Sequence, residues 1–257
     1  MSTHFAAGTD QPIKFSIIIP ARNEEKYIGR CLETLAAAAS AFPGQVEVIV
    51  MLNRCTDQTE AVARSFGAVT LVNDSKNLSQ IRNAGIRAAR GDIIVTIDAD
   101  SWVTDNMLTE IDRLLATGEY IGGGVRSAFE RNSLGITMSA LVLIVPLLFK
   151  YGMVSVGLFW GYKKDFEAIQ GFDEQMLMAE DADFACRLKK WGKQNGKKYG
   201  TVTKAIMTTS CRKFDAGGDW ILVKRPWLVL AYLKGTNRKY ADETYYEMEY
   251  KETNHVR

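Results

Sequence analysis

The chain has 257 residues, of which 47% are hydrophobic and 24% are charged, enough for one large α/β domain or two small ones with a substantial core. The formal net charge of +2 gives no reason to expect nucleic acid as a partner. The four cysteines contain no CxxC pair, which argues against a zinc set and a disulfide framework and fits a reducing cytoplasm.

The first half of the chain alternates between strand and helix patterns. Residues 1–14 are polar and lack the basic and apolar regions of a secretory signal, so no signal peptide is expected. Strands are predicted at residues 15–19, 46–51, 69–72 and 93–97, and helices at residues 25–40, 57–67 and 78–90. The second helix is expected to open with a capping box from Asp57 to Glu60. This alternation predicts βαβ units in a parallel sheet.

Beyond the fourth strand the pattern changes. A helix is predicted at residues 105–116, and Gly122 to Gly124 indicate a strand or bend where the backbone comes close to another segment. A helix and a strand are expected at residues 180–191 and 198–208, and the tail from Tyr240 is expected to form a surface helix or arm. Because no repeat or low-complexity linker divides the chain, the second half is interpreted as an elaboration of the first sheet.

Residues 134–149 are almost wholly apolar, and a second apolar run reaches Trp160. A membrane-spanning helix needs about 20 uninterrupted apolar residues, whereas Pro146 would kink this stretch and Lys150 divides it. Three interpretations stay open: a helix buried in the core, a helix lying at a membrane interface, and a membrane span. Residues 227–233, which basic residues flank, are a second candidate for lying on a membrane surface.

Two carboxylates, Asp98 and Asp100, directly follow the apolar run at residues 93–97. In open α/β sheets the carboxyl edge of the strands is where ligands bind. Carboxylate pairs suit Mg²⁺ or Mn²⁺ that bridge to phosphates, since these ions keep several waters and take only one or two protein carboxylates. The alternative is that these residues merely end a strand and start a turn.

Three other segments carry candidate ligand-binding groups. The first strand runs into a polar cluster with Asn23 and Glu24, which either faces an anion or a base edge or is an ordinary helix entry capped by Asn23. Asn53, just after the second strand, is placed to bind a nucleobase through its amide. Arg82 either reaches a base or diphosphate or lies on a solvated helix face.

The second half adds an acidic pair and a basic segment. Glu180 and Asp181 open the helix at residues 180–191, where they are either first-turn acids favoured by the helix dipole or, for Asp181, a general base. Arg212 or Lys213, after the last predicted strand, could neutralise a leaving diphosphate.

Taken together, these motifs resemble family 2 glycosyltransferases of the GT-A fold. Each motif is weak alone, but they follow the family order between residue 15 and about residue 215. The matching residues are the IIIPARNEE segment, Thr56-Asp57-Gln-Thr59, Arg82-Asn83-Ala-Gly85, Gly91-Asp92, Asp98-Ala99-Asp100, Gly171-Phe172-Asp173, Glu180-Asp181 and Ser210-Cys-Arg212.

The resemblance implies an α/β fold of the GT-A class. A mostly parallel central sheet flanked by helices is expected, with a C-terminal helical, membrane-facing elaboration. The expected boundaries are a glycosyltransferase domain at residues 14–215, with a nucleotide-sugar-binding half at 14–125 and an acceptor-side half at 126–215. A C-terminal helical extension follows at residues 216–257.

The resemblance also implies metal-assisted transfer of a sugar from a nucleotide-diphospho-sugar to an acceptor hydroxyl, with inversion as the family's usual outcome. Asp100 and Asp98 would hold Mg²⁺ or Mn²⁺, and Asp181, with Glu180 beside it, would be the base. The implied donor-binding residues are Pro20, Ala21, Asn23, Glu24, Asn53, Arg82, Asp98, Ala99 and Arg212.

Two departures from the family pattern bear on these roles. Leu52 stands where many relatives carry an acid that binds the base, so the base is undetermined. The only histidines, His4 and His255, lie near the ends of the chain, so no histidine ligand to the metal is expected.

The acceptor and the function have several alternatives. Three classes of acceptor stay open: a small molecule, a glycan and a lipid-linked group. The expected location is the cytoplasm, with a membrane surface as a candidate contact. A sugar-phosphate nucleotidyltransferase is disfavoured because the segment after the first strand lacks a glycine-rich loop. The runner-up is a non-catalytic nucleotide-binding or assembly subunit with the same fold.

Overall fold

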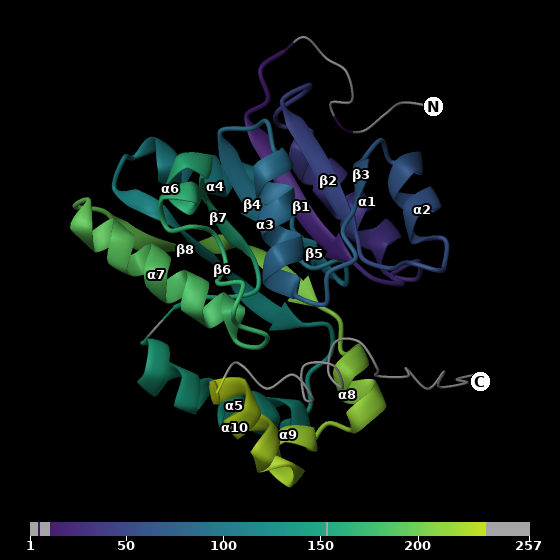
Figure 1. The fold of residues 1–257 in the computed structure, drawn as a ribbon, viewed down its shortest axis with the longest axis vertical. Helices are drawn as coiled ribbons and strands as arrows, with labels where there is room; N and C mark the ends of the chain where they lie inside the picture. Colours follow the sequence, from purple (N-terminus) through teal and green to yellow (C-terminus); the bar gives the residue numbers. More distant parts are fainter. Residues whose placement is uncertain (1–4, 6–10, 153, 235–257) are drawn as a thin grey trace.

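The computed structural model describes residues 5, 11–152 and 154–234, and its centre is one sheet of eight strands (Figure 1). The strand order across the sheet is β3-β2-β1-β4-β7-β6-β8-β5. The strands are β1 Phe15–Ala21, β2 Val46–Leu52, β3 Val69–Val72, β4 Ile93–Thr96, β5 Ser101–Val103, β6 Tyr120–Phe129, β7 Phe159–Tyr162 and β8 Lys198–Thr209.

The first four strands pair in parallel, as their alternation with helices predicts. β7 is antiparallel to both of its neighbours, β4 and β6, whereas β6 and β8 are parallel. β5 pairs antiparallel with β8. The predicted mostly parallel sheet is therefore confirmed, and the strands of the second half extend the first sheet.

Helices cover both faces of the sheet. Alternate residues of β1 serve the two faces: Ile17 packs in the cluster with α1 and α4, and Ile18 packs in the cluster with α3 and α7. Because β1 is buried on both faces, its sequence is a nearly continuous apolar run and does not alternate between apolar and polar residues. The helices are α1 Ile28–Ala39, α2 Thr59–Ser65, α3 Leu78–Ala88, α4 Met107–Ala116, α6 Lys163–Ala168 and α7 Glu180–Gln194.

The apolar stretch forms α5 Leu134–Tyr151, which continues past Pro146, and the interpretation of a buried core helix is wrong. Only three of its residues are buried, while Leu134 is 69% and Phe149 is 89% exposed. It packs against α9 Ile221–Lys224 and α10 Pro226–Lys234 beside the sheet, so no sheet face covers its outer side (Figure 1). By length and composition alone, α5 could cross a membrane.

The structure confirms one local prediction, the close backbone approach at Gly122 to Gly124, and contradicts another, the capping box at the start of α2. A Cβ on Gly123 would lie 2.0 Å from the carbonyl oxygen of Gly200, which confirms the predicted close backbone approach. The capping box is wrong, because α2 begins only at Thr59 and Glu60 pairs with Arg64. The short strand β5 has no sequence prediction, since three residues carry no periodicity. The tail from residue 240 and both histidines lie outside the described residues.

Candidate active site

The carboxyl ends of β1, β2 and β4 meet at one edge of the sheet, because these strands are neighbours and parallel. Glu24, Asn53 and Asp98 follow these ends. The start of α7 and the end of β8 bring Glu180 and Arg212 to the same region. Glu180 is joined to Asp98 through Arg82, and Arg212 contacts Glu24 and Asp100. The acids and bases that the sequence singled out are thus assembled in one place.

Arg82 joins the acids of two distant segments. Its Nη2 donates to Oδ1 of Asp98 at 2.7 Å, and its Nη1 donates to Oε1 of Glu180 at 2.8 Å. The Arg82 side chain is only 6% exposed and its guanidinium lies 5.2 Å from the ring centre of Phe172, so the interpretation as a solvated helix face is wrong. One guanidinium therefore spans from the strand-end acids to the helix that carries Asp181.

Arg212 makes a second bridge. It donates to both carboxylate oxygens of Glu24, at 2.5 and 2.7 Å, and its Nε lies 2.8 Å from Oδ2 of Asp100. The same Oδ2 accepts a hydrogen bond from the Ser210 hydroxyl at 2.8 Å. Burial raises the pKa of Glu24 to about 7, although Arg212 opposes this and the negative charge of Asp100 adds to it.

The turn into α7 presents the two acids predicted for catalysis. Ala179 precedes them with φ of 57°, a left-handed backbone that is unfavourable for alanine and that marks a constrained site. Burial raises the pKa of Glu180 to about 7 against the opposing charge of Arg82. Burial likewise raises the pKa of Asp181, and the negative charge of Asp98 contributes to the shift.

The asparagines near the edge have structural partners. Asn23 has φ of 52° and accepts a hydrogen bond from the backbone N–H of Thr56 on Oδ1, so it joins two loops and does not cap α1. Asn53 is buried and its amide nitrogen donates to the carbonyls of Asn73 and Ser75. A contact between these amide hydrogens and a base would therefore need a rearranged loop.

The remaining predicted donor residues lie in the backbone framework of the edge. Pro20 and Ala21 are the last residues of β1, and the carbonyl of Ala21 accepts the N–H of Asn53 at 2.9 Å. Ala99 is buried between the two aspartates. These three residues have no polar side chain, so any contact with a donor would use their backbone or surface shape.

Sequence reasoning missed the turn that supports Arg82. The Asn83 amide donates to the carbonyl of Phe172 and accepts its N–H, both at 2.8 Å. Gly171 has φ of 64°, and a Cβ there would lie 2.3 Å from Oδ1 of Asn83. Phe172 stacks on Phe184 with ring centres 4.2 Å apart. The motifs Arg82-Asn83 and Gly171-Phe172-Asp173 are visible in the sequence, but nothing local indicates that these two distant segments pair.

The strand-end carboxylates fit a divalent ion that arrives with phosphate. Within the described part of the chain, no three His, Cys, Asp or Glu side chains form a group that could hold a metal alone. Mg²⁺ and Mn²⁺ take one or two carboxylates and complete their shells with phosphate and water. Asp98, whose side chain is 45% exposed, and Asp100 meet this requirement. A metal would compete with Arg212 for Oδ2 of Asp100.

The sequence model of glycosyl transferase family 2 matches residues 16–166, which include β1 to β4 and both strand-end aspartates. The chain belongs to glycosyl transferase family 2. The family match ends before α7 and Arg212, so it does not test the assignments made to the second half of the site.

Curated relatives match over part of their length. The chain is 34% identical over 103 residues to a dodecaprenyl-phosphate galacturonate synthase of Rhizobium johnstonii. The aligned region covers 36% of this chain and 30% of that protein. It is 32% identical over 136 residues to an undecaprenyl-phosphate 4-deoxy-4-formamido-L-arabinose transferase of Pseudomonas fluorescens, covering 47% and 39%. The chain thus spans well under half of the length of these relatives.

Solved structures share the fold. The structure of TarS 1–349 from S. aureus superposes with a TM-score of 0.61 at 17% identity, covering 90% of this chain and 69% of that chain. Glucosyl-3-phosphoglycerate synthase from Mycobacterium tuberculosis, solved with Mn²⁺, UDP and phosphoglyceric acid, gives 0.58 at 18% identity, covering 88% and 80%. These matches confirm the GT-A fold class.

Proposed function

We propose that the chain transfers a sugar from a nucleotide-diphospho-sugar to an acceptor hydroxyl. The observation that carries the proposal is the Arg82 bridge, since it connects the strand-end acid Asp98 with Glu180 on α7. It brings the proposed phosphate-binding and proton-accepting groups to one site. Family membership and the UDP-GlcNAc complex of TarS support a nucleotide-sugar donor.

In this proposal the donor lies along the carboxyl edge of the sheet. Pro20, Ala21, Asn23, Glu24, Asn53, Asp98 and Ala99 form the part of the site that holds the nucleoside. Arg82 and Arg212 face the diphosphate, because a guanidinium binds phosphate with two parallel hydrogen bonds. Both arginines are held by carboxylates in the structure, so binding would require phosphate to replace at least one of these partners.

Asp98 and Asp100 would hold Mg²⁺ or Mn²⁺, which when bound supplies positive charge to the leaving nucleoside diphosphate. The UDP complexes of glucosyl-3-phosphoglycerate synthase that contain Mn²⁺ or Mg²⁺ support this assignment. Arg212 also carries positive charge beside Asp100, and its release from Asp100 would let it bind the departing phosphate.

Asp181 is proposed as the base. Its carboxylate accepts the proton of the acceptor hydroxyl, the hydroxyl oxygen bonds to the anomeric carbon, and the bond from that carbon to the phosphate oxygen breaks. This single displacement inverts the anomeric centre. Its raised pKa improves its ability to take a proton at neutral pH, because a base works best when its pKa lies near the working pH. Glu180, buried and paired with Arg82, positions that arginine.

Calorimetry with UDP and GDP, with and without Mn²⁺, tests the donor assignment. We expect one nucleoside diphosphate to bind and Mn²⁺ to strengthen its binding, with the free nucleoside as the control. If neither nucleotide binds under any metal condition, the runner-up, a non-catalytic assembly subunit, is favoured.

We further propose that the protein meets a lipid-linked acceptor at a membrane surface, on the cytoplasmic side. The exposed apolar side chains of α5, α9 and α10, which we call the apolar layer, support the membrane contact, because contiguous exposed apolar patches mark interaction sites. The relatives named for dodecaprenyl and undecaprenyl phosphate add support. The apolar layer is defined by the exposed residues Leu134, Met138, Leu141, Ile144, Val145, Leu148, Phe149, Trp220, Val223, Trp227 and Leu230.

Flotation with phosphatidylcholine vesicles tests the membrane contact. We expect the protein to float with vesicles and the variant Phe149→Ser with Trp227→Ser to remain in the soluble fraction. A wild-type protein that stays wholly soluble would contradict the membrane contact without touching the donor assignment. The division at residues 14–125, 126–215 and 216–257 is part of the same proposal, with the last segment supplying membrane contact.

A further inference from the structure

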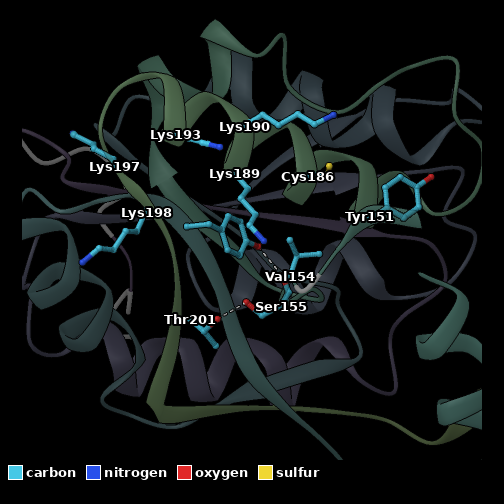
Figure 2. A pocket seen from close by; sticks show the side chains of 11 residues that line it. Tyr151, Val154, Ser155, Cys186, Lys189, Lys190, Lys193, Lys197, Lys198 and Thr201 are labelled. Atoms are coloured by element: carbon cyan, nitrogen blue, oxygen red, sulfur yellow. Dashed lines mark hydrogen bonds between the residues drawn. The ribbon is translucent and has the colours of Figure 1, made fainter. Parts of the chain in front are cut away.

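A cavity of about 880 Å³ lies between α7, the first residues of β8 and the segment that follows α5 (Figure 2). None of its lining residues belongs to the candidate active site. In Figure 2 the Lys189 side chain extends from α7 toward Ser155. The lining consists of Tyr151, Val154, Ser155, Cys186, Lys189, Lys190, Lys193, Lys197, Lys198, Tyr199 and Thr201.

The charged residues that line this cavity are all lysines, and we call it the lysine cavity. Five lining residues are lysines, and no aspartate or glutamate is among the lining residues that the structure describes. Lys198 pairs with Glu119, which lies outside the lining, at 3.1 Å. Glu119 offsets the charge of Lys198, and the lining keeps an excess of positive charge that a bound anion would offset. Because lysine ammonium groups are common phosphate ligands, the cavity suits a phosphate-bearing ligand.

The position of the cavity indicates where that phosphate comes from. Tyr151, the last residue of α5, forms part of its wall, so the cavity begins where the apolar layer ends. Lys150 lies in the last turn of the same helix. A lysine cluster beside an exposed apolar helix is the arrangement by which proteins bind anionic lipid headgroups.

The cavity is also connected to the proposed base. Tyr199, in its lining, donates its hydroxyl to the carbonyl of Ser155 at 2.6 Å. Burial raises the pKa of the Tyr199 hydroxyl, and the negative charge of Asp181 adds to this shift. Asp181 and Lys189 lie on the same helix, and their separation of eight residues corresponds to about 12 Å along the axis. A ligand bound at Lys189 would therefore lie one short helix segment away from the proposed base.

We propose that the lysine cavity binds the phosphate of a membrane-lipid headgroup while the apolar layer contacts the acyl chains. The proposal rests on the membrane contact proposed above and specifies its chemistry. It assigns the cavity a positioning role, in which the headgroup orients α7 and the active site relative to the bilayer.

Vesicle flotation tests this inference with phosphatidylcholine vesicles that contain or lack phosphatidylglycerol. Lys189→Glu with Lys193→Glu changes one face of α7, and Lys164→Glu with Lys204→Glu is the matched control on exposed lysines outside the cavity. We expect wild type and control to prefer phosphatidylglycerol vesicles and the cavity variant to lose this preference. The expected loss is about fivefold per lysine replaced, and added salt should weaken the wild-type preference.

Each outcome bears on one proposal. If wild type binds both kinds of vesicle equally, or if the control variant loses the preference for phosphatidylglycerol as much as the cavity variant does, the proposed headgroup binding is overturned. The proposed membrane contact of the apolar layer is then unaffected. Retained UDP binding and an unchanged melting curve show that the cavity variant is folded. Should it unfold, the pair Lys189→Gln and Lys193→Gln replaces it, and full retention of the preference in that pair overturns the inference.

Discussion

Replacing Arg82 by methionine tests the bridge on which the proposed site depends. Arg82 and Glu180 have side chains that are 6% and 4% exposed, with 2.8 Å between Nη1 and Oε1. Removing one partner of a buried ion pair leaves the other charge uncompensated, at a cost of about 3–5 kcal/mol. The Asp98 contact adds little to this figure because that side chain is 45% exposed.

The loss of unfolding free energy in Arg82→Met should depend on pH, and the ionisation of Glu180 determines whether the loss grows or shrinks as the pH falls. The pKa of Glu180 is already about 7, and Arg82 is the largest influence that lowers it. Without Arg82 the pKa rises further, so the folded variant takes up a proton as the pH falls and the buried charge disappears. The loss of unfolding free energy should therefore be largest near pH 8 and shrink toward about pH 5.

Urea unfolding and thermal melting at both pH values provide the measurement. Near pH 8 the melting temperature of Arg82→Met should fall by roughly 10 °C. Arg87→Met is the control: that side chain is 66% exposed and lies 3.8 Å from Glu174, so its loss should be below about 1 kcal/mol. Adding Glu180→Gln to Arg82→Met should restore stability near pH 8. A small or pH-independent loss in Arg82→Met would refute the reasoning.

Three further changes address the site and its support. Asp100→Asn should remove the effect of Mn²⁺ on nucleotide affinity, measured by calorimetry; the same affinity gain with Mn²⁺ in the variant would exclude Asp100 as a ligand. Asp181→Asn should lower turnover by about 10²–10⁴-fold while donor affinity survives, since the base touches only the acceptor, and near-native turnover would remove this role. Gly171→Ala should lose about 1–3 kcal/mol in urea unfolding, because its Cβ would meet Asn83 at 2.3 Å and its φ is 64°. Gly118→Ala, with φ of 71° and no atom within 4 Å, should lose less, and equal losses would contradict the predicted clash.

The strands and helices of the first half could be predicted because their signal is local. β1 to β4 and α1 to α4 follow the predicted segments within a few residues, and the family resemblance gave the fold class. The exposed position of α5 could not be predicted, since an apolar run has the same composition whether a sheet or a membrane covers it. β5 is too short for periodicity and exists only because β8 pairs with it.

In the candidate site too, some features could be predicted from the sequence and others depend on the tertiary structure. The sequence by itself determined which residues carry charge at the ends of strands and at the start of α7, because residue type and local pattern are written in the chain. Only the tertiary structure decided their partners: Arg82 meets a residue 98 positions away, and Arg212 meets one 188 positions away. The physical reason is that ion pairs and cavities depend on distances between segments, which form only when the sheet brings those segments together. The lysine cavity is the same case, since its walls come from α7, β8 and the end of α5.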